Sequence, residues 1–323
     1  MKRIFITGST GCIGTSTVNY LLSQGVERVY GFNRSAPQHP VQDRFEVLVG
    51  DITDSNSLRE ALRSVQPDRI IHLAALQTPD CQASPFFGMN VNLVATANLL
   101  QIVAEECKGL ERFVFASSAA VHGPRGLHPE GSVGPNALYA PPNLYGYWKT
   151  AGEGMAQAFQ METGIPTVSL RLATTYGPGR DRGLTSAPTS AMKACVLGFD
   201  YQIPYQGREH YHYVDDVGCG FAEAAVSPFQ GYDAFHLPGT TIEITEFCKH
   251  IENKASHMGI ENHGSVSVMP GASVMPFTCD LDHGPTLLQF PRMSLTPVEN
   301  GILKSLELFS TQLIDGSLEL PTP

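Results

Sequence analysis

The segment YGYWK places a phenol, Tyr145, and an ammonium, Lys149, four residues apart. On a helix this spacing puts both side chains on one face, where the cation stabilises the phenolate. A tyrosine, whose usual pKa is about 10, then acts as a base closer to neutral pH. The segment FASSAAVHG carries Ser118 at the end of a strand-like run. Because a hydroxyl orients a substrate oxygen, the three residues predict proton removal from an alcohol while a hydride leaves its carbon.

The N-terminal segment MKRIFITGSTGCIG predicts a site for the acceptor of that hydride. A short apolar strand runs into Gly8, Gly11 and Gly14, and apolar residues at helical spacing follow. Strand, glycine turn and helix together bind a dinucleotide, because glycines let the backbone approach a pyrophosphate and the helix start offers free N–H groups. Cys12 and Ile13 lie inside this turn. We interpret Cys12 as a small residue that fills the turn rather than as a reactive thiol.

With this glycine turn, the serine and the YxxxK pair, the chain resembles the extended branch of the short-chain dehydrogenase/reductase superfamily. This branch includes nucleotide-sugar epimerases and dehydratases. The segments VGDITD, HLAA, NVNLVATANLL and RLATTYGPG match it in order over about the first 240 residues. The resemblance implies that Asp51 and Ile52 contact the adenine and that Ala74 lines the cofactor channel. It also implies that Lys149 holds the nicotinamide ribose.

Strand-like and helical patterns alternate through the first half of the chain. The strand-like runs are Arg3–Thr7, Arg28–Phe32, Phe45–Val49, Arg69–Leu73, Arg112–Ser117, Thr167–Leu172 and a run near Ala234–Leu237. Helical patterns lie between them at 12–24, 56–65, 90–107 and 145–163. This alternation predicts an α/β protein with a doubly wound parallel sheet, a Rossmann fold, whose site lies at the carboxyl ends of the strands.

The regular alternation of strand-like and helical patterns stops after Tyr176. Two Gly- and Pro-rich runs, 177–188 and 268–276, are predicted to be loops. Helices are expected near 188–198, 216–227, 245–259 and 297–313. By the family resemblance, these segments build a second, smaller mixed α/β lobe. We therefore predict a dinucleotide-binding domain of residues 1–175 with a returning segment at about 205–238, and a substrate-binding lobe of about 176–204 and 239–323.

The second strand ends in GFNRS, which bears on the choice of cofactor. A carboxylate at this point would accept hydrogen bonds from the ribose hydroxyls of NAD, whereas an arginine would pair with the 2′-phosphate of NADP. Asn33 takes the position of the carboxylate and Arg34 follows it. NADP is therefore favoured over NAD, with the alternative that Arg34 stacks on the adenine or lies in solvent.

The residues after Ser118 narrow the class of reaction. Dehydratases of the family carry Asp-Glu there, since the elimination of water needs an extra acid and base. Ala119 and Ala120 supply neither, so dehydration is not expected. An NAD(P)-dependent oxidoreductase acting on a secondary alcohol or ketone is favoured, and a sugar or nucleotide-sugar 4-epimerase is the alternative. A third reading, an NAD(P)-sensing regulatory binding protein, does not require the three reactive residues.

Two departures from the family concern the substrate. Thr174 stands where sugar-nucleotide relatives carry an amide, and Glu209 stands where they carry an arginine that contacts phosphate. A carboxylate facing phosphate is repulsive, so a smaller sugar-like substrate, such as a sugar, sugar acid or polyol, is favoured. His122 and Arg180 are further candidate substrate residues. The alternatives are that His122 fills space and that Arg180 lies in a solvated loop.

His210 and His212 alternate just before Asp215-Asp216, and a spacing of two puts both rings on one face of a strand. No third ligand lies at a suitable spacing, so no metal is expected. We interpret His212 as a residue that lines the substrate cleft.

Composition excludes several classes of partner. The 323 residues carry a net charge of −10, with 42% hydrophobic and 16% charged residues and no basic cluster, which disfavours nucleic acid. No apolar run reaches the length of a signal-peptide core or a membrane span, so no membrane association is expected. Seven scattered cysteines without a CxxC predict free thiols in the cytoplasm. By the resemblance, helices 90–107 and 145–163 are expected to form a homodimer, although internal packing explains their small residues equally well.

Overall fold

The computed structural model describes residues 2–36, 42–183, 185–318 and 320. Residue 184 of the predicted loop 177–188, and residues 319 and 321–323 of the predicted lobe, lie outside the described residues.

Seven parallel strands form the main sheet in the order β10-β6-β5-β4-β1-β2-β3. Their bounds are β1 Arg3–Thr7, β2 Arg28–Asn33, β3 Phe45–Val49, β4 Arg69–His72, β5 Arg112–Ser118, β6 Thr167–Leu172 and β10 Tyr232–His236. Because the chain reverses its direction of winding at β1, the strand ends open a crevice there. The predicted doubly wound parallel sheet is confirmed.

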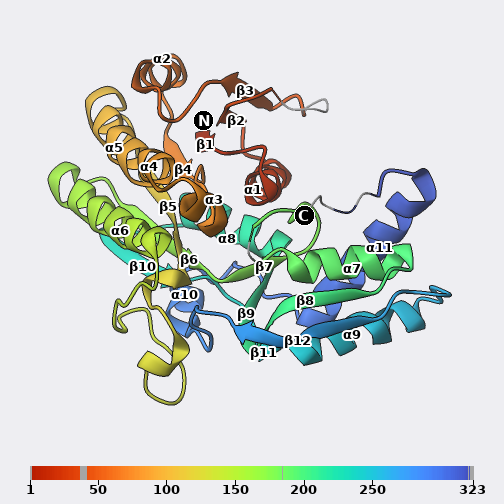
Figure 1. The fold of residues 1–323 in the computed structure, drawn as a ribbon. Helices are drawn as coiled ribbons and strands as arrows, with labels where there is room; N and C mark the ends of the chain where they lie inside the picture. Colours follow the sequence, from red (N-terminus) through yellow and green to blue (C-terminus); the bar gives the residue numbers. More distant parts are fainter. Residues whose placement is uncertain (1, 37–41, 184, 319, 321–323) are drawn as a thin grey trace.

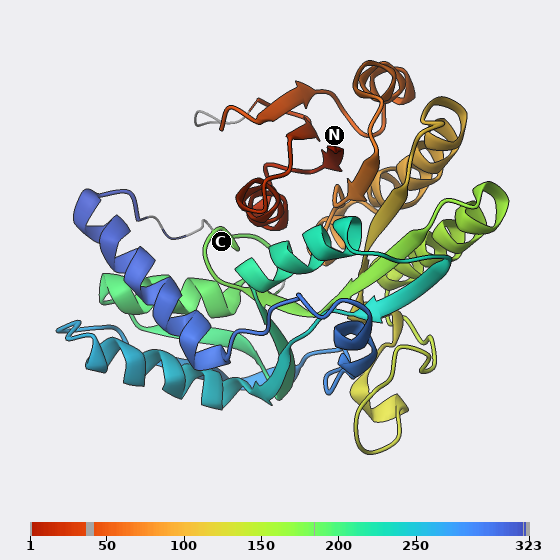
Figure 2. The same cartoon turned by 180° about the vertical axis from the view of Figure 1, so that it is seen from behind.

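Helices cover both faces of this sheet (Figures 1 and 2). Alternate residues of β1 point to opposite faces, so Ile4 and Ile6 join one core and Phe5 joins the other. The first core contains residues of α1, Cys12–Ser23, and α8, Val214–Val226. The second contains residues of α2, Ser55–Val65, of α5, Ala95–Glu106, and of α6, Leu144–Thr163.

A long apolar helical run lies within this second layer. It joins α4, Pro85–Met89, a π-helical turn η1, Asn90–Val94, and α5, and it follows the short α3, Thr78–Ala83. The run Pro85–Glu106 is long and apolar enough to cross a membrane, but half of its 18-residue window is buried inside the protein. Since Leu99, Ile102 and Val103 pack into the sheet core, the run is a core helix.

The remaining elements build the smaller lobe. One sheet pairs β7, Thr174–Tyr176, β9, Arg208–Tyr213, and β11, Thr240–Glu243, and a second pairs β8, Tyr201–Gln206, with β12, Val266–Val274. Its helices are α7 Ala187–Leu197, α9 Ile244–His257 and α11 Val298–Asp315, whereas the short α10, Gly284–Gln289, packs against β10 of the main sheet. The lobe has its own core, around Tyr176 and Phe247. The smaller mixed α/β lobe that the family resemblance implied is therefore present.

Two details differ from the expectations. The run 268–276 was predicted to be a loop, but most of it belongs to β12, which pairs with β8 across a register shift between Val268 and Ser273. Within the returning segment 205–238, β10 joins the main sheet while β9 pairs with β7 and β11 in the lobe. The exact division into two domains stays a prediction.

Candidate active site

The glycine turn after β1 forms a tight backbone loop. Gly8 has a φ of 76°, a value that L side chains rarely adopt. A Cβ on Gly14 would lie 2.3 Å from the Gly8 carbonyl oxygen, so only glycine permits this approach. Gly11 caps α1, and the first-turn N–H groups of that helix have no partner within the helix. The loop therefore offers backbone donors and room for a phosphate group.

A cavity of about 350 Å³ lies over this turn. Its lining includes the cofactor residues predicted from the glycine turn and the adenine end, namely Gly8, Gly11, Cys12, Ile13, Gly14, Asn33, Arg34, Asp51, Ile52 and Ala74. The Asn33 side chain accepts hydrogen bonds from Thr10 at 3.2 Å and donates to Ser9 Oγ at 2.7 Å, which holds the loop against β2. The cavity fits a dinucleotide, because it joins backbone donors at one end to polar side chains at the other.

The three predicted catalytic residues line a second cavity of about 180 Å³. Ser118 ends β5, while Tyr145 and Lys149 lie on the first two turns of α6. Asn143 caps this helix by accepting the Gly146 N–H at 3.0 Å. A Cβ on Gly146 would lie 2.9 Å from the Ala120 carbonyl oxygen. Glycine at this point lets α6 approach the segment after Ser118, which brings the three side chains to one cavity.

The two cavities share part of their lining. Seven residues line both cavities, namely Ile13, Leu73, Ala75, Leu76, Gln77, Ala116 and Arg180. A dinucleotide laid along the glycine turn would therefore reach the cavity of the tyrosine.

Lys149 is held in place by the strand beneath it. Its Nζ donates to the Ala116 carbonyl oxygen at 2.7 Å and lies 5.6 Å from the centre of the Tyr145 ring. Burial lowers the pKa of Lys149 to about 8. The side chain is therefore mostly protonated at neutral pH, but it releases its proton more easily than an exposed lysine does.

The expected lowering of the Tyr145 pKa by Lys149 needs correction. Burial raises the pKa of Tyr145, and it outweighs the opposing effects of the Ser118 hydroxyl and the Arg180 charge. Lys149, with a pKa of about 8, is mostly protonated at neutral pH, but its charge does not offset the burial of Tyr145. Ser118 and Arg180 are therefore the groups that favour the phenolate in this structure.

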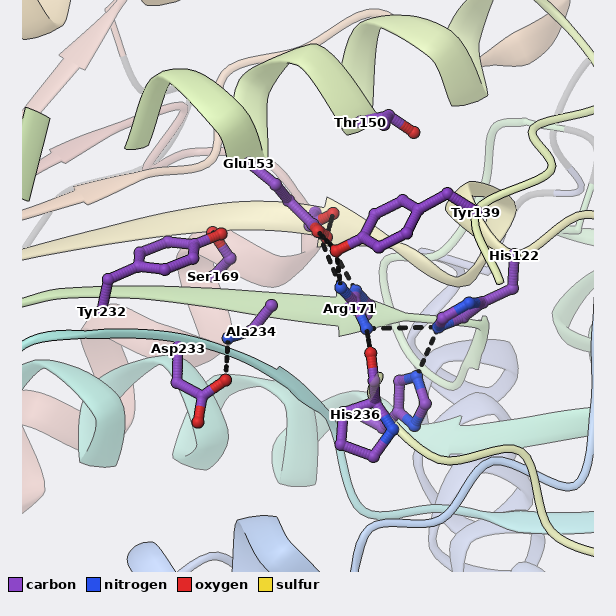
Figure 3. A network of polar contacts seen from close by, with 12 residues as sticks. His122, Tyr139, Thr150, Glu153, Ser169, Arg171, Tyr232, Asp233, Ala234 and His236 are labelled. Carbon is purple, nitrogen blue, oxygen red and sulfur yellow. Dashed lines mark hydrogen bonds and ion pairs between the residues drawn. The ribbon is translucent and has the colours of Figure 1, made fainter. Parts of the chain in front are cut away.

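A buried network of polar contacts stands behind the site (Figure 3). Glu153, one turn beyond Lys149 on α6, pairs with Arg171 of β6, whose Nε and Nη2 lie 2.8 and 2.7 Å from its oxygens. Ser117 of β5 donates to the same carboxylate, and Tyr139 donates to it at 2.7 Å. Because one carboxylate joins two strands and a loop, it fixes α6 on the sheet.

The predicted substrate residues fall into two groups. Thr174 and Arg180 line the cavity of the tyrosine, as expected. His122 and His212 are not among the residues that line it, which corrects their expected position. His122 is fully buried, with its Nε2 2.9 Å from that of His236, and forms part of the network in Figure 3. His212 Nε2 accepts the Ala173 N–H at 2.9 Å, so this ring ties β9 to the residue that joins β6 and β7.

Several cavity residues were not predicted from the sequence. His210 lines the cavity from β9 beside Glu209, whose place near the substrate the sequence did indicate, and Phe277 and Thr278 line it from the segment after β12. Asn92, in the π-helical turn, bonds the N–H and C=O of Leu76 at 2.7 and 2.9 Å and so holds the chain that separates the two cavities. A π-turn often marks a functional site, but its sequence reads as ordinary helix.

His210 and His212 lie on one face, as predicted, with ring centres 5.1 Å apart. Within 2–36, 42–183, 185–318 and 320, no group of three or more His, Cys, Asp or Glu side chains is placed to hold a metal ion.

Known proteins are similar to this chain in sequence. An uncharacterized UDP-glucose epimerase of Bacillus subtilis, YtcB, is 30% identical over 261 residues, 75% of this chain and 76% of that protein. An uncharacterized protein of Sinorhizobium fredii, y4nG, is 29% identical over 78% of this chain and 61% of its own length. The chain spans between 52% and 61% of several such relatives.

Solved structures share the fold. A UDP-glucose 4-epimerase with UDP-glucose from Thermotoga maritima superposes with a TM-score of 0.81 at 20% identity, over 96% of this chain and 99% of that one. The model of the NAD dependent epimerase/dehydratase family matches residues 4–232, which contain the glycine turn and all three predicted catalytic residues. The chain therefore belongs to the NAD dependent epimerase/dehydratase family.

Proposed function

We propose that this protein is an NAD(P)-dependent oxidoreductase that moves a hydride between the nicotinamide and a secondary alcohol or ketone of a sugar-like molecule. One observation carries the proposal. Ser118, Tyr145 and Lys149 line one cavity, and that cavity shares seven lining residues with the cavity over the glycine turn. A proton acceptor and a dinucleotide site thus meet at one place.

The chain's residues would divide the reaction between them. Ser118 and Tyr145 hydrogen-bond the reacting oxygen, and the Tyr145 phenolate takes its proton. Arg180 stabilises that phenolate by charge, and Lys149 holds the nicotinamide ribose. The bound nicotinamide supplies the chemistry of accepting or returning the hydride. Proton transfer by a positioned side chain contributes about 10²–10⁴-fold to rate, which sets the scale of the tests.

The assignment of the base is tested by Tyr145→Phe. Turnover should fall by about 10²–10⁴-fold, while the dissociation constant of the cofactor changes little, because the hydroxyl is lost and the ring stays. Tyr147→Phe is the matched control, since Tyr147 lies on the same helix with 59% of its side chain exposed. Retention of most activity in Tyr145→Phe would refute the assignment.

A 4-epimerase is the second candidate, and the relatives favour it, since several are named as UDP-glucose epimerases. An epimerase returns the hydride to the other face and regenerates its nucleotide in place. Denaturing the purified protein and weighing any released nucleotide by mass spectrometry separates the two. Retained cofactor near one per chain supports the epimerase, and an empty protein that binds cofactor reversibly supports the dehydrogenase. A cofactor-dependent partner protein, with no turnover of any substrate class, would support the sensing role.

We infer a preference for NADP over NAD. Arg34 lines the adenine end of the cavity, and its charge adds to the hydrogen bonds from Thr53 that lower the pKa of Asp51. No carboxylate stands at Asn33 to repel a 2′-phosphate. Arg34→Ala should lower the ratio of NADP to NAD affinity by about tenfold, the value of one lost charge contact of ~1.4 kcal/mol. Arg28→Ala, at the other end of β2, is the control; an unchanged ratio in Arg34→Ala would favour NAD.

We infer that two chains associate through α6 and the helical run Pro85–Glu106. Both carry exposed apolar side chains, among them Phe86, Tyr147 and Met161 at 82%, 59% and 75% exposure. A Cβ on Gly152 would enter the Phe115 ring, so this glycine serves internal packing, whereas Gly154 faces open space. Light scattering should give twice the mass of one chain, and Tyr147→Glu should reduce the measured mass to that of one chain. The seven free thiols, six of them buried, support a cytoplasmic location.

A further inference from the structure

The lobe places a carboxylic acid in the cavity of the tyrosine. Glu209 lies on β9, is only 4% exposed and lines the same cavity as Tyr145. Its Oε2 is buried and has no hydrogen-bond partner among the residues that the structure describes. A buried acceptor without a partner is costly, so such an atom in a binding cavity points to a group that a ligand supplies.

The surroundings of Glu209 contain few compensating charges. The charge of Glu209 raises the pKa of both Tyr205 and Tyr211. The Tyr205 hydroxyl is buried without a partner in the described chain, whereas the Tyr211 hydroxyl lies within reach of the Glu209 carboxyl. The charge of Arg180 opposes the raised pKa of Tyr205, and Cys248 raises the pKa of both tyrosines. Burial raises the pKa of Glu209 to about 7, against the smaller opposing effects of Thr174 and Tyr211. The carboxyl is therefore partly ionised near neutral pH.

The arginines at the mouth of the cavity are already engaged. A neighbouring open cavity shares Arg208 and His210 with that of the tyrosine and is also lined by Arg125. Arg125 and Arg208 both bind Asp280, at 3.0 Å and at 2.8–2.9 Å. Arg180 keeps a buried Nε without a partner in the described residues. This set offers one available guanidinium, too little positive charge for a diphosphate.

The size of the cavity agrees with a small ligand. About 180 Å³ is close to the ~150 Å³ in which a protein interior holds one benzene molecule. This space must also admit the nicotinamide, because Ala116 and Leu73 at the cofactor end line it.

We propose that Glu209 is the specificity-determining residue of this cleft: it accepts hydrogen bonds from hydroxyl groups of a small, unphosphorylated sugar-like substrate and repels substrates that bring a phosphate to the same place. The proposal rests on the proposed function for the identity of the substrate. The repulsion of phosphate can be measured without any turnover.

The test is equilibrium binding to the cofactor-loaded protein by calorimetry at pH 8, with UDP-glucose and glucose 1-phosphate as anionic probes. Glu209→Gln should bind both up to about tenfold more tightly than the wild type, since about one wild-type carboxyl in eleven is neutral at pH 8. The same variant should bind the unphosphorylated sugar or sugar acid that the wild type oxidises at least tenfold more weakly. Glu243→Gln removes an equal charge from an exposed position on the neighbouring strand β11 and should change neither.

The wild type gives a second readout that needs no variant. Its affinity for UDP-glucose should rise up to about tenfold from pH 8 to pH 6, as Glu209 gains its proton, and the rise should be absent in Glu209→Gln. Tight binding of UDP-glucose to the wild type at pH 8, equal to that of Glu209→Gln, would overturn the proposal. If the preference changes as expected but no compound is oxidised or reduced, the proposed function fails and the role of Glu209 stands.

Discussion

The buried ion pair of Glu153 and Arg171 should be the most sensitive single contact behind the active site. The two side chains are 3% and 1% exposed, and their closest atoms are 2.7 Å apart. Removing one member of such a pair leaves an uncompensated buried charge and costs about 3–5 kcal/mol. In Glu153→Ala, Arg171 loses two hydrogen bonds, and Ser117 and Tyr139 each lose an acceptor. We therefore expect a loss of about 4 kcal/mol in the free energy of unfolding.

Urea unfolding measures this loss directly. The chain has a single tryptophan, Trp148, which is 7% exposed on the same helix, so its fluorescence reports on α6. With a typical m of about 1–3 kcal/mol per molar urea, the midpoint should fall by at least ~1 M. Glu162→Ala, at an exposed position near the end of α6, is the control and should stay within about 0.5 kcal/mol of the wild type.

A double variant separates charge burial from loss of packing. Replacing both members with apolar residues, Glu153→Met with Arg171→Met, removes the uncompensated charge and should recover most of the stability. Because α6 carries the base, Glu153→Gln should lower kcat more than it raises KM. A Glu153→Ala variant within about 1 kcal/mol of the wild type would refute the reasoning, since a buried guanidinium would then be tolerated without its partner.

Three other outcomes are expected. Burial lowers the pKa of His122 and of His212 to about 4, below the 6.5 of an unfolded histidine. The unfolded state therefore binds more protons, and each ring should cost up to about 1.4 kcal/mol of stability per unit as pH falls from 6.5 towards 4; urea midpoints that stay level from pH 7 to 5.5 would contradict this. Gly14→Ala puts a Cβ 2.3 Å from a carbonyl oxygen of its own turn and should abolish cofactor binding in a fluorescence titration, whereas Gly109→Ala, whose Cβ meets nothing within 4 Å, should not. Asn92→Ala leaves the half-buried N–H of Leu76 unpaired, while its C=O keeps the Cys81 thiol, and should cost about 1–3 kcal/mol by urea unfolding, with a raised KM.

Much of the main sheet could be predicted because its signals are local. Parallel strands buried on both faces give continuous apolar runs, and Arg3–Thr7 and Thr167–Leu172 end where the pattern ends. The glycine turn could be predicted because other residues do not fit at its glycine positions. Gly8 has a positive φ, and Gly14 makes a close backbone contact that leaves no room for a Cβ. The place of the site, at the carboxyl ends of the strands, could be predicted from the rule that ligands bind where the winding reverses.

The lobe was harder to predict because its contacts are distant in sequence. β12 contains Pro270 and Gly271, which read as a loop, and it forms a strand only because β8 supplies a partner. The alternation in REHYHY correctly placed His210 and His212 on one face. It could not show which ring faces a cavity, since that depends on Ala173 and Pro238, which satisfy His212 from other elements.

The main sheet and the smaller lobe carry different parts of the proposed function, proton transfer in the first and the choice of substrate in the second. The main sheet and α6 carry the groups that would move a proton, and β9 carries the acid that would choose the substrate. Arg180 lies where the two meet, because it lines both cavities and its charge acts on Tyr145 and on Tyr205 beside Glu209. A change at Glu209 should therefore alter which molecule binds while leaving proton transfer intact. A change at Arg180 should alter both, because its charge favours the phenolate and also offers the one available guanidinium to the substrate.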